Sequence, residues 1–219
     1  MLPVGGKPIL EHLIELVRDH DVFDVAINLH YKPQAIVDYF GDGRDLDVHI
    51  TYSFEDRLLG SAGGAKRLEH FLDETFVVIY GDVLADVDLD QLAAVHRANQ
   101  ALATLALYEV PEPSRCGIVK LDREGRVLRF VEKPAPELGM GNLANAGIYI
   151  LDPSVLSFVP TDGPFDFGFD LFPRLLQAGL PMYGHVSDGY ILDIGSQERY
   201  AQAQADFAAG LFGRRVVAA

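Results

Sequence analysis

The stretch TFVVIYGD, residues 75–82, is the most apolar strand pattern in the chain, and it ends in a Gly-Asp pair. A run of apolar, β-forming residues without polar alternation predicts a strand that is covered on both faces. The segments before and after it alternate between short apolar runs and helical patterns, which is typical of a parallel sheet flanked by helices. Ligands of such sheets bind at the carboxyl ends of the strands. Asp82 therefore stands where a functional side chain is expected.

Most of the chain fits this alternation. Helices are expected within residues 8–20, 33–40, 58–72, 88–100, 167–179 and 196–210. Strands are expected within residues 23–30, 47–54, 75–82, 101–108 and 143–153, with a hairpin over 117–134 and two short strands within 181–195. We expect one α/β domain over residues 1–210, whose mainly parallel sheet becomes mixed in the second half, and a loosely held C-terminal tail at residues 211–219.

The bulk properties of the 219-residue chain limit the classes of function. It carries 18 Lys and Arg against 32 Asp and Glu, a net charge of −14, which disfavours nucleic acids as partners. A small phosphorylated ligand stays compatible, because a metal ion can bridge the ligand and an acidic protein. Cys116 is the single cysteine, so an internal disulfide is excluded. No apolar run approaches the roughly 20 residues of a membrane span. These properties predict a soluble cytoplasmic protein.

Acidic residues cluster after the apolar strand, in the segment GDVLADVDLD, residues 81–90. Asp82, Asp86 and Asp88 offer oxygen ligands that suit a hard divalent cation and its phosphates. The same residues also fit a polar turn that leads into a helix. For Asp88 we favour a helix N-cap, which is a common position for aspartate, whereas for Asp82 both interpretations stay open. The seven histidines show no spacing typical of a metal site.

Other segments carry weaker signals. LLGSAGGAK, residues 58–66, places bare backbone amides at a helix start, where they can contact a ligand or pack another element closely. VEKP, residues 131–134, sets a carboxylate beside an ammonium group, which is also common at plain surfaces. Asn145 and Gly147 could recognise hydroxyl groups of a ligand, or they could simply begin a strand. Asp193 lies between two apolar residues and needs a cation or a hydrogen-bonded turn.

One ordered series of segments spans residues 2 to about 200: LPVGGKPILEHLI, LLGSAGGAK, VVIYGDVL, FVEKP, NAGIYIL, DLFPRLL and LDIGSQERY. Together they resemble the sugar-1-phosphate nucleotidylyltransferases, also called sugar nucleotide pyrophosphorylases. The mannose-1-phosphate guanylyltransferase branch is the most similar one. The resemblance implies a Rossmann-like three-layer sandwich with a mainly parallel mixed sheet, the GT-A-like nucleotidyltransferase fold.

The resemblance also implies a reaction. A phosphate oxygen of a sugar 1-phosphate attacks the α-phosphorus of a nucleoside triphosphate, which is GTP in the most similar branch, and pyrophosphate leaves. Such a transfer needs Mg²⁺, cationic groups and alignment of two anions more than covalent help from the protein. GDP-mannose is the product that the most similar branch indicates.

Roles carry over from the family to matching positions of this sequence. The metal would be held by Asp82 and Asp193, which together with Lys133 form the expected catalytic set. Lys133 would bind the sugar phosphate. Gly60, Ala62 and Gly63 would lie against the nucleotide base. Glu132 would bind the sugar hydroxyls, and Asn145 and Gly147 would line the sugar pocket.

The resemblance further implies an element before the opening segment. In the family, LPVGGKP (residues 2–8 here) follows a first β-strand and a Gly-rich loop that wraps the triphosphate. That strand would be central, between the strands that contain VAINL and VVIYG. We therefore expect an N-terminally incomplete domain that lacks this first central strand. Either the natural protein is longer and this sequence starts at an internal Met, which we favour, or the chain is truly shortened and catalytically weak.

Alternative functions stay open. A glucose-1-phosphate thymidylyl- or uridylyltransferase differs only in base and sugar, which small-residue loops do not specify. A glycosyltransferase that consumes sugar nucleotides is suggested by DVD, residues 86–88, which imitates a D-x-D metal motif. A non-catalytic homologue that binds sugar nucleotides and regulates an active enzyme would fit the absence of the Gly-rich loop. Assembly into a homo-oligomer is left open.

Overall fold

The observed elements follow the hydrophobic pattern. The computed structural model describes residues 1–213; the rest of the predicted tail, residues 214–219, lies outside the described residues. The helices are α1 Ile9–Arg18, α2 Pro33–Phe40, α3 Ser61–Arg67, α4 Leu89–Ala98, α5 Phe172–Gln177 and α6 Gln197–Ala208. The strands are β1 Pro3–Val4, β2 Lys7–Pro8, β3 Asp24–Leu29, β4 His49–Phe54, β5 Phe76–Ile79, β6 Val83–Asp86, β7 Ala103–Glu109, β8 Gly117–Leu121, β9 Val127–Glu132, β10 Leu143–Leu151, β11 Met182–Val186 and β12 Tyr190–Asp193.

The largest sheet is organised around β10. The strand order is β11-β7-β10-β8-β9, and β5 pairs with the other edge of β10. β10 runs antiparallel to both β5 and β7, so β5 and β7 point the same way, and β11 is parallel to β7. β8 is also antiparallel to β10, and β9 is antiparallel to β8. The sheet is therefore mixed, with β9 and β10 running opposite to β5, β7, β8 and β11. This confirms the predicted α/β class with a mixed sheet.

A bulge divides β10 into two halves. The register with β7 shifts between Asn145 and Tyr149, and before the shift Ala144 pairs with both Tyr108 of β7 and Ile118 of β8. The Gly147 amide donates to Asn145 Oδ1 at 3.1 Å, and Asn145 Nδ2 donates to the Tyr149 hydroxyl at 2.8 Å. Gly147 has φ +72°, a conformation that residues with a Cβ rarely adopt. The bulge lets one strand serve three partners.

Helices cover both faces of this sheet, as a three-layer sandwich requires. Alternate side chains of β10 point to opposite faces. Tyr149 and Leu151 belong to a core with α3, α5 and the π-helical turn Phe167–Leu171. Ile148 and Ile150 belong to a second core with α1 and α4. All four of these β10 side chains are buried.

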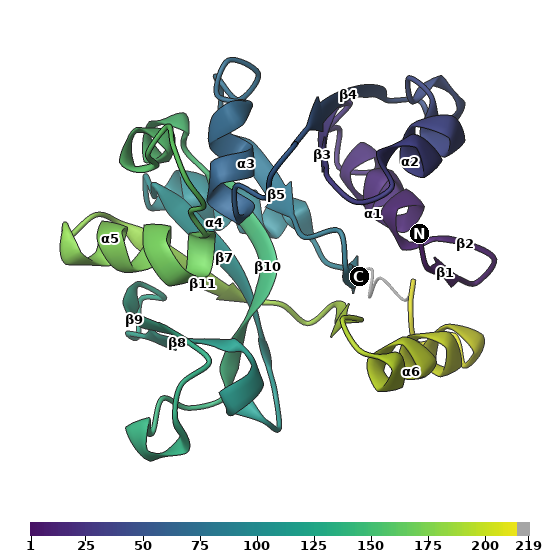
Figure 1. Cartoon of the computed structure of the whole chain (residues 1–219). Helices are drawn as coiled ribbons and strands as arrows, with labels where there is room; N and C mark the ends of the chain where they lie inside the picture. Colours follow the sequence, from purple (N-terminus) through teal and green to yellow (C-terminus); the bar gives the residue numbers. More distant parts are fainter. Residues whose placement is uncertain (214–219) are drawn as a thin grey trace.

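The first part of the chain forms a smaller unit. β3 and β4 pair in parallel and pack with α1 and α2 around their own apolar cluster. Figure 1 shows this unit beside the larger sheet. Within residues 1–213, β3 pairs with β4 alone and β5 with β10 alone. The half-buried side chains of β5 show that it is less covered than its apolar pattern predicted.

The last helix, α6, contacts the N-terminal segment. α6 packs against β1, and both the Tyr200 hydroxyl and the Gln204 amide donate to the Pro3 carbonyl, at 2.6 and 2.8 Å. Apolar residues of α1, β6 and α6 share one cluster, which includes Leu84 and Ala203. No helix among residues 1–213 has the length and apolar character needed to cross a lipid bilayer.

Two elements differ from the prediction. The strand expected over residues 75–82 ends at Ile79, and a turn closed by the Val83 amide on the Tyr80 carbonyl, at 3.2 Å, leads into β6, which was not predicted. The helix expected over residues 167–179 begins as a π-helical turn before α5. Asp82 therefore lies in a turn between two strands, not at the last position of one.

Replacing Gly147 should destabilise the domain. A Cβ at this position would meet the Tyr80 ring at 3.1 Å in addition to the unfavourable φ. We expect Gly147→Ala to lower the free energy of unfolding by roughly 1–3 kcal/mol in urea titration. Gly141→Ala is the matched control, because Gly141 has φ +91° but no atom within 4 Å of its Cβ position. Equal losses in the two variants would contradict a special constraint at Gly147.

Candidate active site

Two acidic side chains meet where β6 and β12 pair. β12 runs antiparallel to β6 with Asp193 opposite Val83, the residue that follows Asp82. The Ile194 amide donates to the Asp82 carbonyl at 2.9 Å and holds the two strand ends together. Asp193 Oδ1 accepts a hydrogen bond from the Gly195 amide at 2.6 Å. The structure thus brings together the two residues that were predicted to hold a metal.

The electrostatics of this pair suit a cation. The pKa of Asp82 is raised, first because the surrounding chain removes part of the hydration of its carboxyl and second because of the negative charge of Asp193. A divalent cation between the two carboxylates would remove this repulsion, and carboxylate oxygens are ligands that Mg²⁺ prefers. Asp82 and Asp193 therefore fit a magnesium ion, which would offset the charge of bound phosphates.

A third carboxylate, that of Glu132, packs closely against two glycines. Glu132 ends β9 opposite Gly117 of β8. A Cβ atom would lie 2.5 Å from Glu132 Oε2 if added to Gly117, and 2.8 Å if added to Gly168. Burial raises the pKa of Glu132, the ammonium of Lys133 opposes this, and Asp166 raises it further. The carboxylate lies against two glycines and can accept hydrogen bonds from hydroxyl groups of a ligand.

Lys133 adopts a strained backbone next to this carboxylate. Its φ is +49°, which is uncommon outside glycine and asparagine. The Lys133 amide donates to the Cys116 carbonyl at 3.0 Å, and this bond holds the turn in place. The side chain is exposed. Strain that the surrounding structure maintains is frequent at ligand-binding positions.

The amides at the start of α3 are bonded within the protein. Ala62 and Gly63 both donate their amides to the Phe165 carbonyl, each at 2.9 Å. Ser61 donates its amide and its hydroxyl to Asp166 Oδ1, at 2.9 and 3.0 Å. Of the two uses left open for these amides, the structure shows close packing for residues 61–63, because residues 165–166 accept their hydrogen bonds. Ala62 and Gly63 are buried, and Gly60 is the half-buried member of the predicted base site.

Tyr80 connects this loop to the bulge of β10. Its hydroxyl donates to Ser61 Oγ at 3.1 Å, and its amide donates to the Gly147 carbonyl at 2.9 Å. The side chain of Asn145 is held by its bonds within the bulge, so its role toward a sugar stays a prediction, as does that of Gly147. The predicted base and sugar residues thus meet around the carboxyl end of β5.

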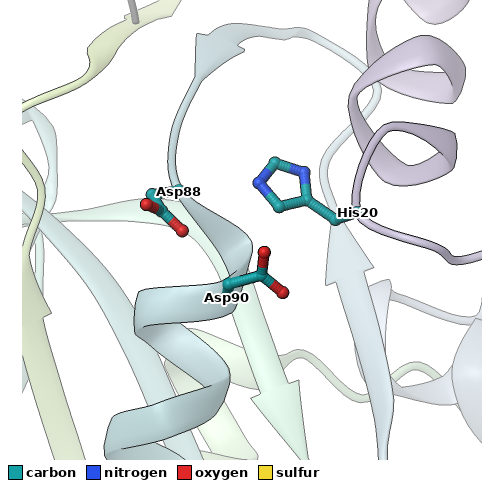
Figure 2. Close-up of side chains that lie close together, drawn as sticks. All are labelled: His20, Asp88 and Asp90. Atoms are coloured by element: carbon teal, nitrogen blue, oxygen red, sulfur yellow. The ribbon is translucent and has the colours of Figure 1, made fainter. Parts of the chain in front are cut away.

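A separate cluster of possible metal ligands serves as a helix cap. Figure 2 shows His20 after α1 facing Asp88 and Asp90 at the start of α4, with ligand atoms within 4.8 Å of one another. The Leu89 amide donates to His20 Nε2 at 3.2 Å, so Nδ1 carries the proton and donates to the Leu16 carbonyl at 2.8 Å. Asp88 accepts from the Gln91 amide at 2.9 Å, which confirms its predicted N-cap role.

Sequence patterns did not single out several residues beside these carboxylates. Tyr108 near the end of β7, Cys116 before β8 and Arg199 in the first turn of α6 interact with one another. Asp193 adds to the raised pKa of both Tyr108 and Cys116, which places this group beside the metal pair. Only Arg199 had a signal, because it belongs to the segment LDIGSQERY that follows Asp193.

The sequence profile described as "Nucleotidyl transferase" matches residues 1–210. The chain belongs to the nucleotidyl transferase family. Its fold is that of a solved UDP-glucose pyrophosphorylase in complex with UDP-glucose, with a TM-score of 0.84, 22% identity, and coverage of 96% of this chain and 90% of that one.

Two curated relatives of this nucleotidyl transferase carry specific names. A UTP–glucose-1-phosphate uridylyltransferase of Synechocystis sp. is 40% identical, over an aligned region that covers 93% of this chain and 56% of the relative. A mannose-1-phosphate guanylyltransferase of Mycobacterium tuberculosis is 35% identical, over an aligned region that covers 96% of this chain and 59% of the relative. The chain therefore spans somewhat more than half the length of these relatives, which are named as enzymes that act on sugar 1-phosphates.

Metal binding at the carboxylate pair should change the melting temperature of the protein. Because the pKa of Asp82 is raised on folding, the metal-free protein loses stability as pH rises from the ordinary carboxyl pKa of about 3.9 through the raised value. At pH 7, Asp82→Asn removes this loss, so its melting temperature without metal should exceed that of the wild type. Added Mg²⁺ should raise the melting temperature of the wild type alone.

The matched control for this experiment is Asp45→Asn, an exposed aspartate in the short helix Arg44–Leu46. It should keep the wild-type response to Mg²⁺ and to the chelator EDTA. Stabilisation of Asp82→Asn by Mg²⁺ to the wild-type extent would show that the ion binds elsewhere.

Proposed function

We propose that this chain carries the catalytic site of a sugar-1-phosphate nucleotidylyltransferase, which joins a nucleoside triphosphate and a sugar 1-phosphate into a sugar nucleotide and releases pyrophosphate. The observation that carries the proposal is the meeting of Asp82 and Asp193, together with a half-buried Glu132, on a fold of this family. Family membership supports the reaction class. Mg²⁺ at the carboxylate pair would neutralise phosphate charge during the transfer.

Each charged residue has a separate task in this proposal. Asp82 and Asp193 hold the cation and so orient the phosphates of the nucleotide. Glu132, fixed against Gly117 and Gly168, accepts hydrogen bonds from sugar hydroxyls. The exposed ammonium of Lys133 binds the phosphate of the sugar 1-phosphate. Aligning two anions in this way accounts for most of what a phosphoryl-type transfer needs from a protein.

The identity of the base and the sugar has two candidates. The sequence motifs most resemble mannose-1-phosphate guanylyltransferases, which favours GTP and mannose 1-phosphate. The 40% identity to a uridylyltransferase, against 35% to a guanylyltransferase, favours UTP and glucose 1-phosphate. We propose both pairs for direct comparison.

Pyrophosphate release with Mg²⁺ over a grid of nucleoside triphosphates and sugar 1-phosphates tests the reaction. The chain should be assayed as it stands and in a version extended upstream with the family's first strand and Gly-rich loop. Turnover with one of the two proposed pairs is the expected result. Absence of pyrophosphate release with every pair in both forms would overturn the catalytic proposal and favour a protein that only binds sugar nucleotides.

The charge of Lys133 should act on the sugar phosphate specifically. Lys133→Asn removes the charge and keeps a residue type that tolerates the left-handed conformation. We expect the KM for sugar 1-phosphate to rise by about 10-fold or more, the loss typical of one charge-assisted contact, with little change in the KM for the nucleotide. Lys120→Asn, at an exposed position of β8, is the control. Equal effects on both substrates would contradict the assigned role.

A further inference from the structure

Arg199 is a cationic residue at the edge of the site, and the proposed function gives it no role. It lies in the first turn of α6, and its amide donates to the Ser196 hydroxyl at 3.2 Å, which caps the helix. Ser196 follows Asp193 and Gly195, so the capped turn begins directly beyond the metal pair. The position of Arg199 is therefore fixed by the same short segment that positions Asp193.

The sheet register places Tyr108 and Cys116, the neighbours of Arg199, beside Glu132. Tyr108 is opposite Ala144, and Ala144 is also opposite Ile118 of β8. The residue before that strand is Cys116, and the first residue of the strand, Gly117, is opposite Glu132. Tyr108 and Cys116 thus lie near each other at one end of the sheet, beside Glu132.

Contacts of the guanidinium agree with this placement. Arg199 lies close to the Tyr108 hydroxyl. Burial raises the pKa of Tyr108 to about 12, Cys116 and Asp193 raise it further, and Arg199 lowers it. Burial also raises the pKa of the Cys116 thiol, Arg199 opposes this, and Asp193 and Glu132 add to it. Arg199 is therefore the cation in a region where the influence of Asp193 meets that of Glu132.

Within the part of the chain that the structure describes, Arg199 forms no ion pair. The ion pairs found among residues 1–213 do not include it, and its side chain is half-buried. A guanidinium with spare donors, partly withdrawn from water and with no ion pair among the described residues, is suited to an anion supplied from outside. Its planar fork matches phosphate oxygens in a way that the ammonium of lysine does not.

We propose that Arg199 binds the phosphate of the sugar 1-phosphate, a contact that rests on the proposed function. In that function the sugar lies at Glu132 and the metal at Asp193. The phosphate joins the sugar to the metal-bound nucleotide, so it must lie between these two carboxylates. Arg199 and Lys133 then hold it from different elements, α6 and the end of β9. Arg199 positions the attacking phosphate oxygen, and Tyr108 keeps the guanidinium in place.

The test compares Arg199→Gln and Arg199→Lys with the wild type. Arg199→Gln should raise the KM for sugar 1-phosphate by about 10- to 100-fold and leave the KM for the nucleotide within about 2-fold. Arg199→Lys should recover part of the loss. Calorimetric titration with glucose 1-phosphate and mannose 1-phosphate should show the same loss of affinity. Melting temperatures should stay near that of the wild type, because no ion pair of the fold is removed.

Two controls separate this role from a structural one. Tyr108→Phe removes the hydroxyl that contacts Arg199 and should weaken sugar 1-phosphate binding far less than Arg199→Gln does. Arg129→Gln, at an exposed position of β9, should behave as the wild type. Equal losses in Tyr108→Phe and Arg199→Gln, or unchanged binding in Arg199→Gln, would overturn the inference.

The same experiments distinguish failure of the inference from failure of the proposed function. A wild type that binds sugar 1-phosphate but forms no product would contradict the proposed reaction and leave Arg199 to be judged by binding alone. A wild type that turns over, with Arg199→Gln turning over at the same KM, would contradict the inference alone. A wild type that binds no sugar 1-phosphate would overturn both.

Discussion

The pairing of β10 with three strands is the constraint on which the rest of the structure depends. One half of the strand pairs with β5 and β7, and the other half pairs with β7 and touches β8. This division is possible because Gly147 takes a left-handed conformation and Asn145 closes the bulge with its own side chain. The bulge brings the β8–β9 hairpin, and with it Glu132 and Lys133, to the same end of the sheet as Tyr108. Both apolar cores also meet on β10.

The second constraint is the pairing of β6 with β12, which joins residues far apart in the sequence. It places Asp193 beside Asp82 and directs the chain into α6, whose first turn carries Arg199. Asp82 bears an unfavourable like-charge neighbour that a bound cation would relieve. Such an arrangement is typical of a functional site, because a fold selected for stability alone gains nothing from two adjacent carboxylates. The family membership of the chain agrees with this interpretation.

Much of the fold could be predicted from periodicity and turn residues. The helix over residues 33–40 was predicted to the residue, and the caps at Asp88 and Ser196 follow from their residue types. β6 was missed because VLAD, between two aspartates, shows neither strand alternation nor length. The internal bonding of the α3 amides could not be foreseen, since Phe165 and Asp166 lie about a hundred positions away along the chain. Tyr108 and Arg199 were missed for the same reason: their proximity to the site exists only after distant strands pair.

One measurement tests the central claim directly, which is that Asp82 and Asp193 form a metal site joined to a sugar-nucleotide pocket. Crystals of the protein grown with Mn²⁺ and either UDP-glucose or GDP-mannose would locate the metal by its anomalous scattering. The expected result is a peak between Asp82 and Asp193, with the diphosphate extending toward Arg199 and Lys133 and the sugar against Glu132. A peak at His20, Asp88 and Asp90, with the Asp82–Asp193 pair empty and the ligand bound elsewhere, would contradict the assignment of the active site.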